Sequence, residues 1–225
     1  MNKLRKKLIN GAVELGVCLD DAAADKLFIY KDFLKEYNEK VNLTSIVADE
    51  EIIVKHFLDS LTVLHALPPD ISQRVKIIDI GTGAGFPGLV LKIAWENIDL
   101  VLVDSTRKKI RFLEEATERL GLNGVECIHA RAEELARQKP ELAGSFDYAV
   151  SRAVARLAKL AEYCLPYVRP GGEFIAMKGR NYQEELDEAQ KIIKKLGAEV
   201  LDAKEVTLPG SDIVHSIIRI RACSH

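Results

Sequence analysis

The chain has 225 residues, a length that suits one α/β domain with a helical extension. Its formal net charge of −2 excludes a global basic field that would attract nucleic acid, so any such contact must come from local patches. No stretch is long and apolar enough for a transmembrane helix, and the basic N-terminus lacks the apolar segment of a signal peptide. The four cysteines form no C-x-x-C pair, which predicts free thiols in a reducing cytoplasm. Cys223 and His225 are interpreted as part of a frayed tail, and no bound metal is expected.

The first seventy residues carry apolar side chains at helical spacing. The predicted first helix ends near Gly16 and has four inward residues, Leu4, Leu8, Val13 and Leu15. Asp20 or Asp21 is expected to cap a second helix, whose aromatic residues are predicted to lie in the core rather than to stack on bases. A third helix is expected to begin near Asp49 and to end at Pro68-Pro69, so residues 1–70 are predicted to form a helical cap.

Residues 75–88 read VKIIDIGTGAGFPG, which predicts a buried strand, a glycine turn and the start of a helix. Residues 83–88 fit the dinucleotide fingerprint G-x-G-x-x-G, so an NAD-linked oxidoreductase is one alternative and a turn without a ligand is another. Asp79, at the end of the strand, suits a cationic ligand better than a pyrophosphate. S-adenosylmethionine, which has a sulfonium and an amino group, is therefore the favoured ligand of Asp79, Gly81, Gly83 and Gly85.

The remaining chain alternates between expected strands and helices. Strands are predicted at 98–103, 125–129, 146–150 and 173–177, and helices at 106–120, 133–138, 156–165 and 182–196. Residues 170–172 are expected to form a turn, and residues 200–206 and 213–220 a hairpin. Because an NAD-binding domain lacks the terminal hairpin, residues 71–225 are predicted to be a class I, Rossmann-like S-adenosylmethionine-dependent methyltransferase domain. This α/β fold has a seven-stranded, mostly parallel sheet with one antiparallel strand.

Four polar side chains follow successive predicted strands, at the edge where an open parallel sheet binds its ligand. Asp104 is placed to accept hydrogen bonds from ribose hydroxyls, Glu133 lies where an adenine is expected, and Arg152 lies near the methionine end. Each has a structural alternative: Asp104 can cap the next helix, and Glu133 is a first-turn acid that the helix dipole favours. Arg131 precedes Glu133 at this same edge.

Six short motifs occur in order: Asn42-Leu-Thr-Ser, His56-Phe-Leu-Asp59-Ser60, the glycine segment 79–88, Arg131-Ala-Glu133, Ser151-Arg152-Ala153 and Met177-Lys178-Gly179. Together they resemble the ribosomal RNA small-subunit methyltransferase G family, also called GidB, over roughly residues 25–220. The resemblance implies S-adenosylmethionine-dependent methylation of N7 of one guanine in 16S rRNA, with the rRNA or small ribosomal subunit as partner. It also implies cofactor contacts from Gly81, Phe86, Ala132, Glu133 and Arg152.

Guanine N7 has a lone pair and no proton, so its methylation requires no general base and no catalytic residue is nominated. Rate is expected to come from alignment of the two reactants and from exclusion of water. Arg152, Asn42 and His56 are candidates for orienting the target. For His56, a hydrogen bond to Asp59 or to a backbone group is an equal alternative.

Basic residues gather around the same edge and predict contacts with RNA phosphates. The candidates are Arg107, Lys108, Arg111, Arg131, Arg156, Lys178 and Arg180. Two other functions remain open: a class I methyltransferase that acts on a small molecule or protein, and a non-catalytic RNA-binding factor for ribosome assembly. The protein is expected to be a cytoplasmic monomer without a membrane partner.

Overall fold

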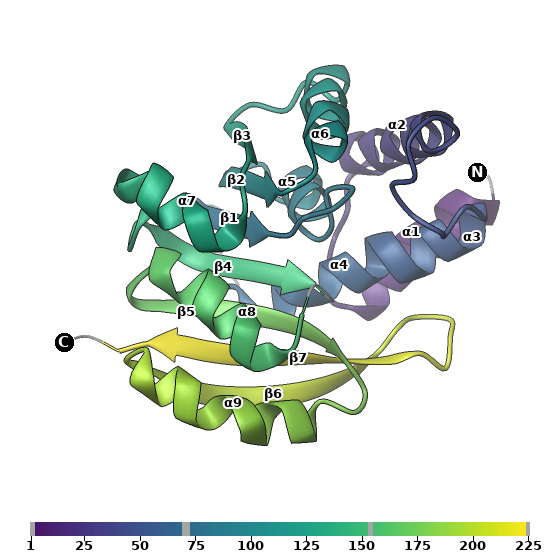
Figure 1. Ribbon diagram of the computed structural model, residues 1–225. Coiled ribbons are helices and arrows are strands. Elements are labelled where there is room, and N and C mark those ends of the chain that lie inside the picture. Colours follow the sequence, from purple (N-terminus) through teal and green to yellow (C-terminus); the bar gives the residue numbers. More distant parts are fainter. Residues whose placement is uncertain (1–2, 69–72, 153–154, 224–225) are drawn as a thin grey trace.

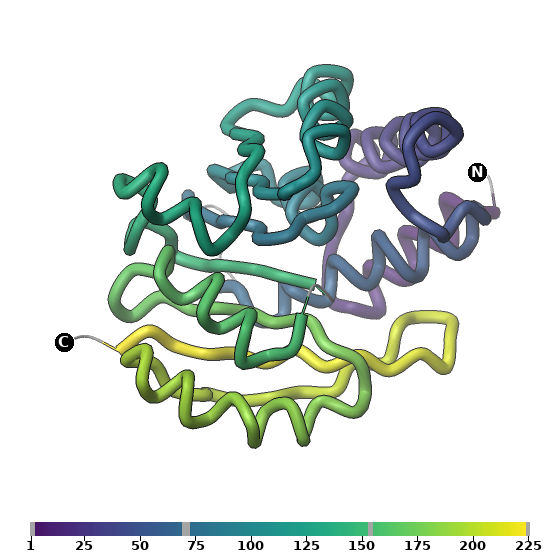
Figure 2. Tube along the Cα trace, in the orientation of Figure 1, coloured from purple at the N-terminus to yellow at the C-terminus, as the bar shows by residue number. Residues whose placement is uncertain are grey.

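The computed structural model describes residues 3–68, 73–152 and 155–223. The predicted domain boundary at residues 70 and 71 lies outside these ranges, as do Pro69, Ala153 and His225. In the view of Figure 2, the marks for the N- and C-terminal ends of the chain lie on opposite sides of the molecule. Within the described ranges, no helix combines the length and the apolar character that crossing a bilayer requires.

Two N-terminal helices confirm the predicted helical extension. They are α1 (Lys3–Glu14) and α2 (Asp21–Asn38). The Asp20 side chain accepts a hydrogen bond from the backbone nitrogen of Ala23 at 2.7 Å, as an N-cap does. Val13, predicted to face inward on α1, is 63% exposed instead, because Leu8, Gly11 and Ala12 form the buried face.

The predicted third helix is helical throughout but changes its winding. It comprises α3 (Asp49–Ile52), the π-helical segment η1 (Ile53–Leu58), α4 (Asp59–Leu61) and the 3₁₀ segment η2 (Thr62–Ala66). The predicted helix is therefore confirmed in its extent, and the structure adds that its winding varies. Nearly every side chain from 52 to 63 is buried, so packing on all sides, rather than an amphipathic period, sets the winding.

The sheet has seven strands in the order β3-β2-β1-β4-β5-β7-β6 (Figure 1). The strands are β1 (Val75–Ile80), β2 (Ile98–Asp104), β3 (Val125–His129), β4 (Phe146–Arg152), β5 (Val168–Gly179), β6 (Ala198–Thr207) and β7 (Val214–Ala222). Strands β1 to β5 pair in parallel, whereas β7 is antiparallel to both β5 and β6. This arrangement confirms the predicted class I topology with one antiparallel strand.

The predicted turn at residues 170–172 is part of β5, so that prediction is wrong. The chain stays in the sheet there as an irregularity, with a register shift opposite Phe146 and Tyr148 of β4. Gly171 has a φ of 79°, and a Cβ on Gly172 would lie 2.6 Å from the carbonyl oxygen of Asp147. The glycines therefore allow a bulge and a close backbone approach rather than a chain reversal.

Helices cover both faces of the sheet, as the alternation along its strands requires. They are α5 (Gly88–Ala94), α6 (Arg107–Arg119), α7 (Ala132–Gln138), α8 (Leu157–Cys164) and α9 (Gln183–Lys195), with short 3₁₀ turns η3 (Pro140–Leu142) and η4 (Leu165–Tyr167). Ile77 faces the core that contains α5, α6 and the N-terminal helices, whereas Ile78 and Ile80 face the core with α7, α8 and α9. Asp79, between Ile78 and Ile80, therefore points toward the side of the N-terminal helices.

Candidate functional site

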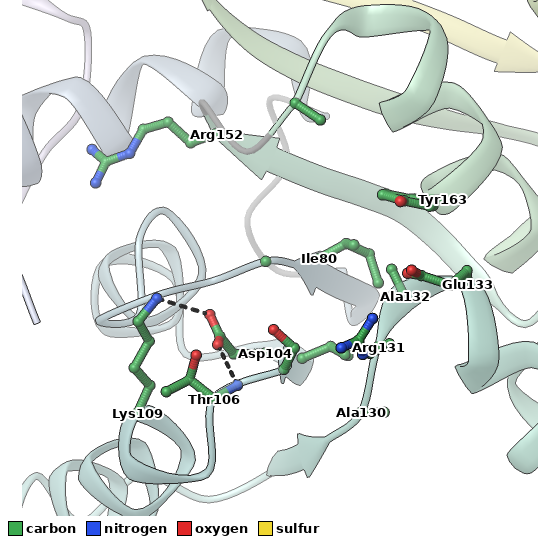
Figure 3. Close-up of a pocket in the computed structure, with 14 residues that line it drawn as sticks. Ile80, Asp104, Thr106, Lys109, Ala130, Arg131, Ala132, Glu133, Arg152 and Tyr163 are labelled. Atoms are coloured by element: carbon green, nitrogen blue, oxygen red, sulfur yellow. Dashed lines mark hydrogen bonds and ion pairs between the residues drawn. The ribbon is translucent and has the colours of Figure 1, made fainter.

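A cavity of about 610 Å³ lies at the carboxyl ends of β1 to β4 (Figure 3). Its lining brings together five of the predicted cofactor residues, Gly81, Asp104, Ala132, Glu133 and Arg152. Apolar side chains of Ile80 and Val103 form part of the wall. The parallel topology thus gathers residues from distant segments at one edge, as expected.

Asp104 holds the start of α6, as its structural alternative expected, and also lines the cavity, whereas a contact with a ribose stays a prediction. Its Oδ1 accepts from the backbone nitrogen of Thr106 at 2.8 Å, which fixes the start of α6. Its Oδ2 accepts from the backbone nitrogen of Gly83 at 3.0 Å, which ties the glycine loop to β2. Lys109 Nζ lies 3.5 Å from the same oxygen and lines the cavity, a contact that sequence reasoning missed. A carboxylate has about four lone-pair sites, so Asp104 retains acceptor capacity toward the cavity.

The three glycines of the loop differ in what surrounds them. Gly81 lines the cavity with a φ of 73°. Gly83 has a φ of 61°, and a Cβ there would meet no atom within 4 Å among the described residues. Gly85 has a φ of 95°, and its Cβ would lie 2.6 Å from the hydroxyl oxygen of Tyr30. Gly85 is therefore required for packing against α2, while Gly83 borders open space.

Tyr30 of α2 holds the glycine loop from behind. Its hydroxyl donates a hydrogen bond to the carbonyl oxygen of Ala84. The ring is fully buried and lies 5.5 Å from that of Phe86 and 5.8 Å from that of Phe57, between centroids. The helical extension and the sheet consequently share one hydrophobic core at the loop.

Asp79 lies beneath the glycine loop and does not line the cavity. Its Oδ2 accepts from Thr82 Oγ1 at 2.7 Å and from the backbone nitrogen of Gly88 at 2.8 Å. Its Oδ1 is buried and has no hydrogen-bond partner in the described part of the chain. Burial raises the pKa of Asp79 to about 6, against the opposing effect of the bonds from Thr82 and Gly88. A direct contact between Asp79 and a cofactor stays a prediction.

The far wall of the cavity comes from the start of α7 and from Tyr163 in the last turn of α8. Glu133 is exposed in the first turn of α7, and Ala132 precedes it. The hydroxyl of Tyr167 donates to the carbonyl oxygen of Ala132 at 2.9 Å and so fixes the beginning of α7. Tyr163 of α8 also lines the cavity, although no sequence motif marked it.

Arg152 lines the cavity but turns its guanidinium away from Asp104 and Glu133 (Figure 3). Its Nη1 donates to Asp59 Oδ2 at 2.9 Å and to the carbonyl oxygen of Lys55 at 3.2 Å. The guanidinium carbon lies 5.0 Å from the ring centroid of Phe86. The helical extension therefore holds this side chain.

His56 is bonded to Arg152 and Thr44, whereas Asp59, one of the partners that the structural alternative offered, is bonded to Arg152 and His215 instead. An arginine can only donate, hence the His56 Nδ1 that lies 3.2 Å from Arg152 Nη2 is the acceptor. Nε2 then carries the proton and donates to Thr44 Oγ1 at 2.9 Å. Burial first, and then the charge of Arg152, lower the pKa of His56 to about 3, so the ring is neutral.

Phe86 stacks on a face of the His56 ring and does not line the cavity. The two rings stack with centroids 4.2 Å apart and an interplanar angle of 14°. Phe86 is 4% exposed, and a contact of Phe86 with a cofactor stays a prediction. Asn42, the other candidate for orienting a target, is exposed in the loop before α3.

The predicted RNA-contact residues separate into free and paired cations. Arg107, Lys108, Arg111, Arg131 and Arg180 are exposed, and none forms a salt bridge with another described residue. Arg156 pairs with Glu188 at 2.7 Å. Lys178 pairs with Glu185 at 2.7 Å, is 9% exposed and also donates to the carbonyl oxygen of Ala155. The last contact ties β5 to the segment after β4.

The cavity's donor and acceptor groups fit a ligand with a ribose and a cationic end. The carboxylates of Asp104 and Glu133 accept from hydroxyl and amino groups, and the open space at Gly83 lets a ligand approach the backbone. The orphaned Oδ1 of Asp79 provides a further buried acceptor beneath the loop. A pyrophosphate would instead face the carboxylates of Asp104 and Glu133.

The model of one protein family, GidB, described as rRNA small subunit methyltransferase G, matches residues 23–214. The chain belongs to the GidB family. Two relatives in this family carry the name ribosomal RNA small subunit methyltransferase G. That from Acetivibrio thermocellus is 48% identical over 97% of this chain and 88% of its own length. That from Alkaliphilus metalliredigens is 46% identical over 95% of this chain and 88% of its own length.

Solved structures of low sequence identity share the fold of this GidB-family chain and show its architecture alone. A ribosomal protein L11 methylase from Lactobacillus delbrueckii has a TM-score of 0.55 at 13% identity and covers 76% of this chain and 80% of its own. M. jannaschii TYW2, solved in complex with AdoMet, has a TM-score of 0.53 at 14% identity, covering 66% of this chain and 69% of its own. The [4+2]-cyclase SpnF has a TM-score of 0.58 at 16% identity and covers 75% of this chain and 82% of its own, so the fold by itself does not fix the reaction.

Proposed function

We propose that this protein transfers the methyl group of S-adenosylmethionine to N7 of a guanine in the 16S rRNA of the small ribosomal subunit. The observation that carries the proposal is the family match over residues 23–214, because it includes both the helical extension and the cavity. The topology of the sheet and the carboxylates of Asp104 and Glu133 in the cavity support the same cofactor.

In this proposal the cofactor is held at the carboxyl ends of β1 to β4. Asp104 would accept from the ribose hydroxyls, Ala132 and Glu133 would face the adenine, and Gly81 and Gly83 would provide backbone contact. Arg152 would serve the methionine end, and Asp79 would hold the glycine loop from beneath through Thr82 and Gly88. When bound, S-adenosylmethionine supplies a methyl group on a positively charged sulfur, which a neutral nucleophile can accept directly.

The side chains near Arg152 suit a reaction that moves no proton. Guanine N7 offers a lone pair and has no proton to lose, so a general base is unnecessary. His56 is neutral, and both of its ring nitrogens are already engaged by Arg152 and Thr44. The role left to these residues is to position the reactants and to exclude water.

The proposed RNA surface consists of the exposed, unpaired cations around the cavity, Arg107, Lys108, Arg111, Arg131 and Arg180. The chain's net charge of −2 gives no global positive field, so phosphates would have to be attracted locally. These exposed cations would provide that local field. Arg156 and Lys178, which were also expected here, are neutralised by Glu188 and Glu185. Phosphate contacts position the RNA without choosing the base, so selection of the guanine falls to RNA shape.

The test is methyl transfer from labelled S-adenosylmethionine to small subunits from cells that lack this gene, followed by mapping of the methylated nucleotide. With the wild-type protein we expect label at N7 of one guanine. Asp104→Ala, which removes the ribose acceptor, should lower the rate of methyl transfer to less than about a hundredth of the wild-type rate. Arg156→Ala, which removes an exposed, paired cation, is the matched control and should retain activity.

Each rival function gives a different result in this assay. Transfer to a small molecule or a protein, with none to subunits, would assign another substrate to the same fold. Heat of binding with NAD and none with S-adenosylhomocysteine would indicate an oxidoreductase. Binding of subunits without any transfer, together with rescue of the gene deletion by Asp104→Ala, would indicate an assembly factor.

A further inference from the structure

Asp59 is a buried carboxylate to which two distant parts of the sheet are attached. It is 1% exposed in α4, and its Oδ2 accepts from Arg152 at the end of β4. Its Oδ1 accepts from His215 Nδ1 near the start of β7. Because a carboxylate only accepts, Nδ1 of His215 carries a proton. The carboxylate is therefore held by both oxygens and cannot rotate freely.

Three of the five N–H donors of Arg152 are used by the helical extension. Asp59 Oδ2 and the Lys55 carbonyl oxygen take both donors of Nη1, and His56 Nδ1 takes one of Nη2. Nε–H and the second N–H of Nη2 have no partner among the described residues. The guanidinium is planar and rigid, so fixing three of its N–H directions also fixes the other two.

His56 is held in turn, which makes its contact with Arg152 directional. Its Nε2–H donates to Thr44 Oγ1, and its ring stacks on Phe86 at 4.2 Å. Thr44 is fixed by Asn38, whose Oδ1 accepts from the backbone nitrogen of Thr44 at 3.0 Å. A neutral His56 also avoids placing a second positive charge beside Arg152.

We propose that Asp59 and His56 are positioning residues that act through Arg152. They fix the direction of its two remaining N–H donors at the edge of the cavity, on the side away from Asp104 and Glu133, where the cofactor or the target guanine would meet them. The inference rests on the proposed function, because it assigns Arg152 a contact with one of these ligands. A buried ion pair is weak evidence of net stabilisation, since desolvation offsets its attraction, so the tests below separate positioning from stability.

The first test compares His56→Phe with His56→Asn. Phenylalanine keeps the stack on Phe86 and removes the acceptor for Arg152, whereas the Asn side-chain oxygen lies at the same number of bonds from the backbone as Nδ1. We expect His56→Phe to lower kcat/KM for subunits or the affinity for S-adenosylhomocysteine by about tenfold. His56→Asn should recover most of that loss. Equal losses in the two folded variants would show that the ring, and not the acceptor, matters, and would overturn the proposal for His56.

The second test is a double-mutant cycle between Asp59→Asn and Arg152→Ala. It is read on cofactor affinity and on kcat/KM, and we expect Arg152→Ala to lower at least one of them by about tenfold or more. In the Arg152→Ala background, Asp59→Asn should cause no further loss. Losses that multiply would mean that Asp59 acts independently of Arg152, and an Arg152→Ala enzyme with unchanged affinity and kcat/KM would equally refute the inference.

Glu173→Gln is the matched control for loss of a buried charge. Glu173 is 7% exposed and pairs with Arg219 Nε at 2.8 Å, near the amino end of the parallel strands. It should lower the denaturation midpoint, as Asp59→Asn does, without changing cofactor affinity. A wild-type protein that binds S-adenosylhomocysteine but methylates no subunit would contradict the proposed function. The cycle read on affinity would then still decide the inference.

Discussion

The carboxyl group of Asp79 should make the stability of the protein depend on pH, and Asp79→Asn should remove that dependence. Its pKa in the folded protein is about 6, compared with an ordinary value of 3.8. A carboxyl whose pKa is raised by folding stabilises the fold fully below the unfolded value and loses that contribution as pH rises through the folded value. The shift is about two pH units, or about 3 kcal/mol at roughly 1.4 kcal/mol per unit.

The asparagine side chain preserves part of the Asp79 environment. Its oxygen can accept from Thr82 and Gly88, while its NH₂ group takes the position of the buried Oδ1, which has no partner among the described residues. A buried donor without an acceptor costs about 1–3 kcal/mol at every pH. The free energy of unfolding of the variant should therefore lie below that of the wild type at pH 4. It should rise relative to the wild type by up to about 3 kcal/mol by pH 8.

Urea unfolding followed by far-UV circular dichroism between pH 4 and pH 8 measures this difference. Other titrating groups contribute equally to both proteins and cancel. Thr82→Val serves as a matched variant, because it removes the hydrogen bond that holds the pKa of Asp79 down. In this variant the pKa of Asp79 should be higher, so the loss of unfolding free energy with rising pH should occur at higher pH than in the wild type. A difference between Asp79→Asn and wild type that is the same at pH 4 and pH 8 would refute the reasoning.

Three further predictions concern the loop and the RNA surface. Gly83→Val should abolish measurable calorimetric affinity for S-adenosylhomocysteine in a protein that still folds. Gly85→Ala should instead lower the free energy of unfolding by about 3 kcal/mol through the clash with Tyr30. Loss of stability in Gly83→Val and loss of affinity alone in Gly85→Ala would contradict the roles given to the two glycines. Tyr30→Phe should lower the free energy of unfolding in urea by about 1 kcal/mol, because it removes the hydrogen bond to the Ala84 carbonyl oxygen. An unchanged free energy of unfolding would show that this hydrogen bond does not stabilise the loop. Arg107→Glu with Lys108→Glu should raise KM for subunits and flatten its salt dependence, with cofactor affinity unchanged; an unaltered KM at two salt concentrations would disprove the contact surface.

The fold was largely predictable because local signals agreed with one another. The apolar run of β1 followed by glycines, the N-cap at Asp20 and the turn before β7 each depend on neighbours in sequence. The alternation of strands and helices then predicted a parallel sheet with helices on both faces, which few sheet topologies satisfy. The winding of residues 52–63 was not predictable in the same way, because burial of nearly every side chain there removes the amphipathic period on which such predictions rely.

The sequence by itself determined which residues gather at the cavity, because the carboxyl ends of parallel strands meet at one edge, and this places Gly81, Asp104, Glu133 and Arg152 together. Only the tertiary structure decided what each of them touches. Gly83 and Gly85 are alike in sequence, yet one borders open space and the other the hydroxyl of Tyr30. Arg152 is held by Asp59 and His56, residues about a hundred positions away, because long side chains choose partners by distance in space and no local pattern records that distance.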